Sequence, residues 1–515
     1  MHLKPNHPSV AAAGRTLIGF NIVHGREVEG DLGLIESRSA VDSRDVVGLF
    51  PDSGAKDVER AAKAAAEAFP AWSRSSAKAR IKLLERVGAI LEAQRGRLGR
   101  VITRETGLTP REAEAEVRLT IDACAELAAL GSKPFQAKAS GPDRHLQRRP
   151  LGVVGILSSQ TSPLALPGRK LLSALHFGNT VVWKPSDGAP STAYLLLRAL
   201  QEAGLPPGVV NTVNGKGRGG CGKHFLGGIE KGFFQLFCFA GSIELGRSVG
   251  ELCGRHLVPA DLETGGRNPM IVLADADLEA AVAVALADAF GGAGQRSSSL
   301  GNILLHPGIA PRFTERFLAG AAALRTGNPL AHPEVDFGPL LNARFAEAFR
   351  QHWVKGRQEG ASLRLGGQQW SEENRTDRVL GEIAKGAYMQ PCVWTGVKPE
   401  MALFGHEVFG PTVNLVEVAS FEAALALVNQ APRGRTASLF SGDRSAALAF
   451  KADARLASLS VNASLGASGP IAQETWNRPH LVVDDGPAAL AAAPASAPEP
   501  AGTTQGPVDW SVLDS

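Results

Sequence analysis

The feature that most constrains the fold of this chain is an alternation of short apolar runs with helical segments. The run Val153–Leu157 ends at Ser158 and predicts a buried strand. The pattern continues with a helix at 166–174, a strand at 179–184, a helix at 191–203 and strands at 209–213 and 232–239. Strands separated by helices of about 10–15 residues are typical of a doubly wound parallel sheet.

A second region repeats this alternation. It predicts strands at 271–273 and 302–305, helices at 278–290 and 311–324, and a strand–helix set between 413 and 449. The first 140 residues are rich in helical spacing, at 58–67, 79–95 and 112–130. We therefore expect two α/β domains with a cleft between them. Beyond Gly486 the sequence is rich in Ala and Pro, which predicts a flexible tail.

Composition excludes several classes of function. The formal net charge is +3, from 54 basic and 51 acidic residues, which is too small for a nucleic-acid-binding surface. The sequence lacks an apolar run long enough for a membrane span, a secretory signal and an HExxH motif. Its five cysteines form no CxxC pair, which favours a reducing cytoplasm and argues against structural zinc or disulfides.

Two motifs at strand ends predict a nucleotide site. The first places Gly241 and Gly246 around the start of a helix, with Ser242 between them, so that free amide groups and a hydroxyl face an anion. The second places Lys184 and Asp187 at the end of another strand, where they would hold the hydroxyls of a ribose. Taken alone, the first motif is equally compatible with a tight turn and the second with a solvated ion pair.

Three further motifs carry candidate chemistry. Glu263 precedes a Gly-Gly pair and is a candidate general base, whose pKa we expect to be raised in an apolar cleft. Ser297 follows a glycine-rich loop that ends a helix, and its backbone amide would face an oxyanion. Glu407 and Phe409 would contact a second ribose and a nicotinamide ring. The alternatives are a surface carboxylate, a plain connector and a hairpin.

In their order and spacing, these motifs resemble the aldehyde dehydrogenase superfamily over about residues 16–470. Glu263 precedes Ser297 by 34 positions, the separation expected between the family's base and its nucleophile. Further segments are similar to family motifs: 57–72, Glu105-Thr106-Gly107 and the AGLPPGVVN stretch at 203–211. Residues 294–296, 466–469 and 477–479 look most like succinylglutamate semialdehyde dehydrogenases.

The resemblance implies an organisation and a set of partners. It places an NAD(P)-binding domain at 16–139 and 154–264, a catalytic domain at 265–458, and an oligomerisation arm at 140–153 and 459–485, followed by the tail at 486–515. Within the arm, the segment 143–150 would be joined by a strand around 459–462. NAD is the expected cofactor, with NADP as the alternative. A small aldehyde or semialdehyde is the expected substrate, and a homodimer or homotetramer the expected assembly.

The sequence departs from the family pattern at three places. The catalytic cysteine of the family falls on Ser297, and the oxyanion asparagine falls on Thr161. The late loop of the family is reduced to Ser464–Gly469, without its Phe and Lys. A serine hydroxyl ionises negligibly without a paired base, whereas a cysteine is a few per cent thiolate at neutral pH. Losing the asparagine donor adds about 3–4 kcal/mol to the barrier if Thr161 does not replace it.

Three hypotheses follow from these departures. The first is a pseudoenzyme that keeps nucleotide binding and serves as a scaffold or regulatory subunit. The second is an oxidoreductase with altered chemistry, in which a semialdehyde hydrate donates hydride directly and Glu263 is the base. The third is a slow esterase that uses Ser297 with Glu263. A cysteine such as Cys238 or Cys253 at the mouth of the nicotinamide pocket would overturn the first hypothesis.

Overall fold

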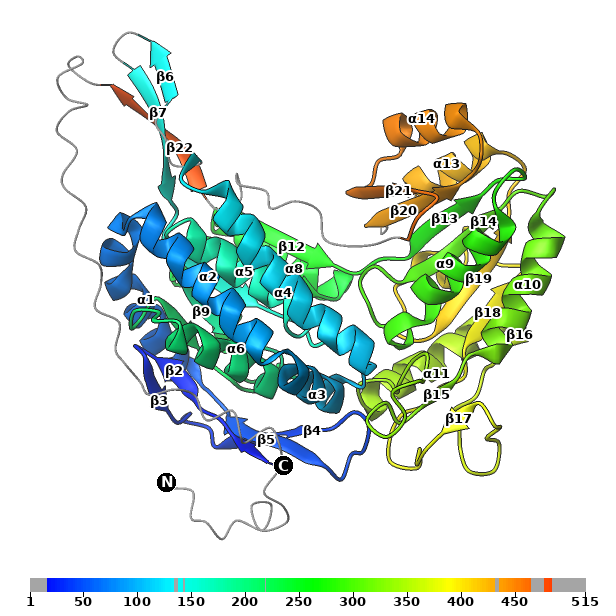
Figure 1. Cartoon of the computed structure of the whole chain (residues 1–515), viewed down its shortest axis with the longest axis horizontal. Coiled ribbons are helices and arrows are strands. Elements are labelled where there is room, and N and C mark those ends of the chain that lie inside the picture. The colour runs from blue at the N-terminus through cyan, green and yellow to red at the C-terminus, as the bar shows by residue number, and fades with distance from the viewer. Residues whose placement is uncertain are drawn as a thin grey trace.

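A computed structural model describes residues 16–133, 138–141, 144–217, 219–430, 435–464 and 477–483. The predicted tail at 486–515 and most of the late loop at 464–469 lie outside the described residues. Two sheets, each flanked by helices, dominate the structure (Figure 1). This arrangement confirms the predicted α/β fold.

The first sheet contains five parallel strands in the order β10-β9-β8-β11-β12. Its strands are β8 (Val153–Leu157), β9 (Thr180–Lys184), β10 (Val210–Thr212), β11 (Leu236–Gly241) and β12 (Ala260–Thr264). Its connecting helices are α5 (Ala165–His176), α6 (Pro190–Glu202), α7 (Cys221–Glu230) and α8 (Ile243–Arg255). The strand order reverses at β8, so the loops after β8 and β11 run apart and open a crevice at the carboxyl ends of the strands.

Four helices precede β8: the first packs against this sheet, and the other three pack on its covering helices α5 and α6. They are α1 (Ala55–Arg74), α2 (Ala77–Ala93), α3 (Arg95–Thr106) and α4 (Pro110–Leu130). A capping box starts α4, because Thr109 Oγ1 accepts from Glu112 N at 3.4 Å and Glu112 Oε2 accepts from Thr109 N at 3.0 Å. The helix that starts at this cap covers the predicted span 112–130. The sequence analysis missed α3, whose charged residues and two glycines obscure a buried stripe at Leu98, Val101 and Ile102.

The second sheet has seven strands in the order β16-β18-β19-β14-β13-β20-β21, all parallel except β16. These strands are β13 (Asn268–Val272), β14 (Leu300–Leu305), β16 (Ser362–Leu365), β18 (Cys392–Thr395), β19 (Thr412–Glu417), β20 (Thr436–Phe440) and β21 (Ser458–Val461). Its helices are α9 (Leu278–Phe290), α10 (Ala310–Ala323), α11 (Ala343–Gln358), α12 (Ala402–Gly405), α13 (Phe421–Gln430) and α14 (Arg444–Asp453).

Smaller sheets complete the described chain. One contains β1 (Leu17–Ile18), β5 (Val46–Pro51) and β4 (Leu34–Arg38), and two are pairs: β2 (Asn21–Val23) with β3 (Arg26–Val28), and β15 (Thr326–Gly327) with β17 (Val379–Leu380). Within the described residues, none of the helices combines the length and the apolar composition that crossing a membrane requires.

A separate three-stranded antiparallel sheet extends from the five-stranded one (Figure 1). It contains β6 (Lys138–Gly141), β7 (Arg144–Pro150) and β22 (Asn477–Val483). The strand expected beside β7, around 459–462, was assigned wrongly. That segment is β21, which pairs with β20 in the seven-stranded sheet, and β22 takes the place beside β7. Residues 459–461 alternate apolar and polar side chains, which suits an edge strand in either sheet. The sequence alone therefore did not decide which sheet this strand joins.

Candidate active site

A cleft of about 2230 Å³ contains the candidate site. On one side it is lined by the loops that follow β8, β9 and β11, which belong to the five-stranded sheet. On the other side it is lined by the loop before β14, by α11, and by the segments 406–409 and 435–436. The carboxyl ends of the parallel strands therefore face elements of the second sheet across this space.

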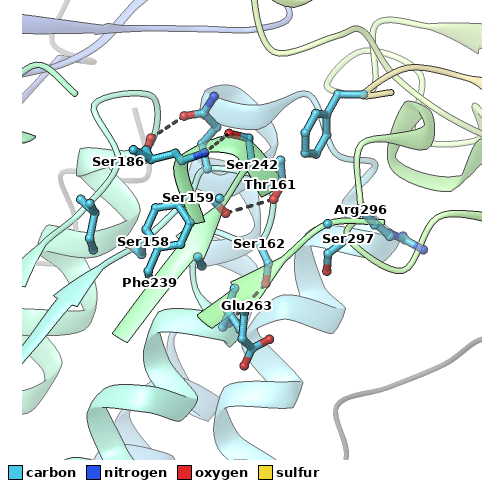
Figure 2. A pocket seen from close by; sticks show the side chains of 18 of the residues that line it. Ser158, Ser159, Thr161, Ser162, Ser186, Phe239, Ser242, Glu263, Arg296 and Ser297 are labelled. Carbon is cyan, nitrogen blue, oxygen red and sulfur yellow. Dashed lines mark hydrogen bonds between the residues drawn. The ribbon is translucent and has the colours of Figure 1, made fainter. Parts of the chain in front are cut away.

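Ser297 lies in this cleft, in the loop that joins α9 to β14 (Figure 2). Gly292 and Ala293 adopt successive left-handed conformations, with φ of 58° and 55°, and turn the chain sharply after α9. Gln295 is buried and anchors the loop by accepting a hydrogen bond from Leu341 N at 3.0 Å. The short turn thus delivers Ser297 at the entrance of β14.

Thr161 lies on the opposite wall, in the loop after β8 (Figure 2). Its hydroxyl shares a hydrogen bond of 3.1 Å with the Ser159 hydroxyl. The neighbouring Ser162 donates to Glu116 at 2.9 Å, and Glu116 also accepts from the backbone amide of Ala165 at 2.9 Å. Glu116 therefore caps the start of α5 and fixes this loop. Burial raises the pKa of Glu116, although these hydrogen bonds act in the opposite direction.

Glu263 is on β12 and is held by two cations. Its Oε1 lies 2.6 Å from Lys170 Nζ, and its Oε2 pairs with the guanidinium of Arg435. Lys170 also pairs with Asp261 Oδ2 at 2.5 Å. These four side chains form a chain of alternating charges along the cleft, which ends at Arg435.

The electrostatics of Glu263 contradict the sequence-based expectation of a raised pKa. Burial acts to raise the pKa of Glu263, but the positive charges of Lys170 and Arg435 outweigh it and lower this pKa below its ordinary value. The error has a plain cause: the expectation assumed an apolar cleft, and the two cations come from segments distant in sequence. Glu263 is accordingly a carboxylate at neutral pH.

Asn268, at the start of β13, joins the Ser297 loop to the Arg435 segment. Its Nδ2 donates to the backbone oxygens of Ser297 and Ser299, both at 2.9 Å. Its Oδ1 accepts from the backbone amides of Arg435 at 3.0 Å and Thr436 at 3.1 Å. The side chain is fully buried, and all of its hydrogen-bonding capacity is used to hold these two segments together.

Lys184 and Asp187 line the cleft at the end of β9, as the sequence predicts for residues at a strand terminus. Lys184 is almost completely buried, and this burial lowers its pKa although the charge of Asp187 acts to raise it. Asp187 Oδ2 accepts a hydrogen bond from Gly217 N at 3.0 Å. A buried cation beside a carboxylate at a strand end suits the hydroxyls of a ribose.

Gly241 ends β11, and Ser242 is the N-cap of α8, whose first turn opens into the cleft. The Ser242 hydroxyl accepts from Leu245 N at 3.4 Å, so it is used as a helix cap as well as being available at the cleft. Gly246 packs its bare Cα against the Thr264 methyl group, where a Cβ would clash. The helix therefore starts close to the sheet, with its amides directed at the cleft.

Glu407 and Phe409 line the cleft from the side of the seven-stranded sheet. The Phe409 ring contacts the Phe345 ring edge-on, with centroids 5.9 Å apart. Glu407 packs directly on Gly265, where any side chain would overlap the carboxylate. Gly265 therefore serves close packing against Glu407.

The five cysteines all belong to the described part of the chain, and all five are buried. None of them is among the residues that line the cleft. Burial raises the pKa of the Cys124, Cys221 and Cys392 thiols to about 12, and it raises those of Cys238 and Cys253 as well. Neither Cys238 nor Cys253 therefore takes the place of the missing catalytic thiol in the cleft.

The structure brings together every residue that the sequence proposed for the site. The following all line one cleft: Thr161, Lys184, Asp187, Gly241, Ser242, Glu263, Ser297, Glu407 and Phe409. Gly246 supports it from α8. The sequence analysis missed Lys170, Arg435 and Asn268. The position of Lys170 could have been predicted from the sequence, because it lies in the first two turns of the helix that follows the Thr161 loop. No sequence feature marks Arg435 as a site residue.

The comparisons with known proteins identify the family. The family model described as "Aldehyde dehydrogenase family" matches residues 28–472. The chain is 33% identical over 436 residues to an alpha-ketoglutaric semialdehyde dehydrogenase of Bacillus subtilis (strain 168), covering 84% of this chain and 87% of that protein. It is 31% identical to a malonate-semialdehyde dehydrogenase of Lacticaseibacillus casei, covering 88% of this chain and 89% of that protein. This chain belongs to the aldehyde dehydrogenase family.

A solved structure gives the same result for the fold. The NAD-dependent aldehyde dehydrogenase from Sinorhizobium meliloti is 27% identical, has a TM-score of 0.83, and is matched over 93% of this chain and 96% of that chain. The fold described above is thus shared with a protein of known structure.

Proposed function

We propose that this chain binds NAD and an aldehyde, with an acidic semialdehyde as the preferred class, and that its oxidation of the aldehyde is weak or lost. NADP is the alternative cofactor. The single observation that carries the proposal is that the cleft is lined by the residues expected to bind the nucleotide but by no cysteine. The semialdehyde dehydrogenases among its relatives, two of which are named above, support the substrate class.

The residues present fit the cofactor. The first turn of α8, with Gly241 and Ser242, offers amides to a pyrophosphate, and Lys184 with Asp187 suits the adenosine ribose. The negative charge of Asp187 disfavours an additional 2′-phosphate. Glu407 and Phe409 would hold the nicotinamide riboside. The bound nicotinamide supplies a hydride acceptor, and the chain supplies everything else.

The nucleophile position lacks an activating base. Among the described residues, the Ser297 hydroxyl makes no hydrogen bond to a histidine or carboxylate. Both oxygens of Glu263 are paired with cations. An unactivated hydroxyl is a far weaker nucleophile than a partly ionised thiol. On the opposite wall, the Thr161 hydroxyl is shared with Ser159. These features support slow or absent turnover, and hence a role as a binding subunit or regulatory scaffold.

One observation favours a second candidate, direct oxidation of an aldehyde hydrate. Glu263 is ionised and lines the cleft. It would take a hydroxyl proton from the hydrate while the carbon-bound hydrogen would leave as hydride to the nicotinamide of NAD, so that the carboxylic acid forms. Its two ion pairs oppose this role, because a carboxylate stabilised by cations is a weaker base. The esterase hypothesis has no comparable support, because Glu263 is ion-paired with Lys170 and Arg435 and makes no hydrogen bond to Ser297 among the described residues.

Two measurements on the purified chain test the proposal. Calorimetric titration with NAD should show saturable binding, and NADH formation with a panel of semialdehydes should be slow or undetectable. Ser297→Cys should raise NADH formation about tenfold or more, because the thiol restores the nucleophile. Ser298→Cys is the matched control, since its thiol lines the same cleft one position away, and it should give no gain. Rapid NADH formation by the wild type would refute the proposal.

A further inference from the structure

Arg435 occupies an unusual position in the cleft. It directly precedes β20 of the seven-stranded sheet, yet its guanidinium pairs with Glu263 on β12 of the five-stranded sheet. The ion pair therefore spans the cleft between the two sheets. Through Asn268, the backbone of Arg435 is also tied to the backbone of Ser297, so the guanidinium and the nucleophile position belong to one rigid corner.

The charge arrangement makes Arg435 the replaceable member of its group. Along the series Asp261, Lys170, Glu263 and Arg435, the exposed fractions of the side chains are 21%, 11%, 15% and 30%. Arg435 is at the end of this series and is its most exposed member. If another anion takes Arg435, Glu263 keeps its contact with Lys170 at 2.6 Å, so no buried charge is left without a partner.

Three other arginines line the cleft. Arg344 is exposed in the first turn of α11, and the charges of the other two serve the framework. Arg296 pairs with Glu112 at 2.6 Å, and Glu112 is also the capping residue of α4 and the acceptor for Gly292 N. Arg169 pairs with Glu126 at 3.2 Å. Moving either arginine toward a ligand would break one of these framework ion pairs.

We propose that Arg435 is the specificity residue for the carboxylate of an acidic aldehyde, and that this carboxylate takes the place of Glu263 on the guanidinium. This inference rests on the proposed function and deepens it. Ligand binding then shifts Glu263 from two cations to one. The chain thereby distinguishes acidic from neutral aldehydes, and it also ties the release of Glu263 to the presence of the correct ligand.

The test uses an unreactive pair of probes, 4-hydroxybutyrate and 1,4-butanediol, which differ in one carboxylate. Their affinities for the full chain with saturating NAD are measured by calorimetry. In the wild type 4-hydroxybutyrate should bind about tenfold or more tightly than the diol, which corresponds to about 1.4 kcal/mol. In Arg435→Met this preference should fall to near one, while Arg435→Lys should keep part of it. Arg169→Met is the matched control and should keep the full preference.

A second variant covers the case in which Arg435→Met folds poorly. Glu263→Gln removes the internal competitor and should make 4-hydroxybutyrate bind severalfold more tightly than it binds to the wild type. The assignment is overturned if Glu263→Gln binds 4-hydroxybutyrate no more tightly than the wild type does. It is also overturned if Arg169→Met loses the preference for 4-hydroxybutyrate over the diol while Arg435→Met keeps it. Titration with NAD alone tests the proposed function separately. NAD binding without an Arg435-dependent preference for 4-hydroxybutyrate refutes only this inference. An Arg435-dependent preference without NAD binding refutes only the proposed function.

Discussion

Asn268 donates a hydrogen bond from Nδ2 to the backbone oxygen of Ser297 at 2.9 Å, and this contact fixes the corner of the cleft where the two sheets meet. Because the same amide group also accepts from Arg435 N and Thr436 N, one buried side chain determines how the 297 loop and the 435 segment lie relative to each other.

Asn268→Ala should therefore lower the free energy of unfolding by about 3 kcal/mol, because several buried backbone groups lose their partner at once. Urea denaturation followed by circular dichroism measures this change. Asn429→Ala is the control: its side chain also bridges two backbone groups, Asp453 O and Arg455 N, but at an exposed site. A loss there should stay below about 1 kcal/mol. Equal losses in the two variants would contradict the bridging role of Asn268.

Gly265→Ala should weaken NAD binding about tenfold, because the added methyl group displaces the Glu407 carboxylate from its position. Calorimetric titration with NAD measures the effect. Gly254→Ala, on α8, has no atom within 4 Å of its added Cβ and provides the control. It should bind NAD normally and gain up to about 1 kcal/mol of stability from its helical position. Normal NAD affinity in Gly265→Ala would show that the place of Glu407 does not matter for the cofactor.

The stability of the chain should depend on Glu263 in the acid range. The folded-state pKa of this group is lowered, so its contribution is present above its ordinary pKa of 4.5 and is lost as the pH falls through the lower folded value. Glu263→Gln should lower the free energy of unfolding by about 1–3 kcal/mol at pH 7. Unfolding curves of the two proteins should converge below pH 4.5, and a gap that widens on acidification would reverse the sign assigned here.

Restoring the oxyanion donor should help only when a thiol is present. Thr161→Asn in the Ser297→Cys background should raise NADH formation by a further factor of about 10 to 100, because the new amide would stabilise the developing oxyanion. The same substitution in the wild-type background should have little effect, because without covalent attack on the aldehyde no tetrahedral oxyanion forms for the new amide to stabilise. Comparing the four proteins in one NADH assay measures this coupling, and equal gains in both backgrounds would argue against it.

The sequence predicts the elements that bury one continuous apolar face. β8 and α9 are at the residues expected, Val153–Leu157 and Leu278–Phe290, because their apolar runs are bounded by clear turn or cap residues. The strand expected at 232–239 begins instead at Leu236. Gly232 adopts a φ of 70°, and Phe234 is buried from the turn, so its apolarity does not signal a strand.

The candidate site was predictable where its chemistry follows strand ends. Lys184, Gly241 and Ser242 each come directly at the end of a strand, and parallel strands bring such positions to one edge. The ion pairs of Glu263 were not predictable in this way. The partner Arg435 comes from the other sheet, and only the packing of the two sheets determines that its guanidinium reaches β12.

The position of the sulfur atoms has a practical consequence. The residues lining the cleft include neither a cysteine nor a methionine, and every thiol is enclosed within the folded chain. Alkylating reagents thus find little thiol to attack until the chain opens. The rate at which iodoacetamide labels this protein should follow its opening equilibrium, so that thiol labelling measures unfolding directly and leaves ligand binding untouched.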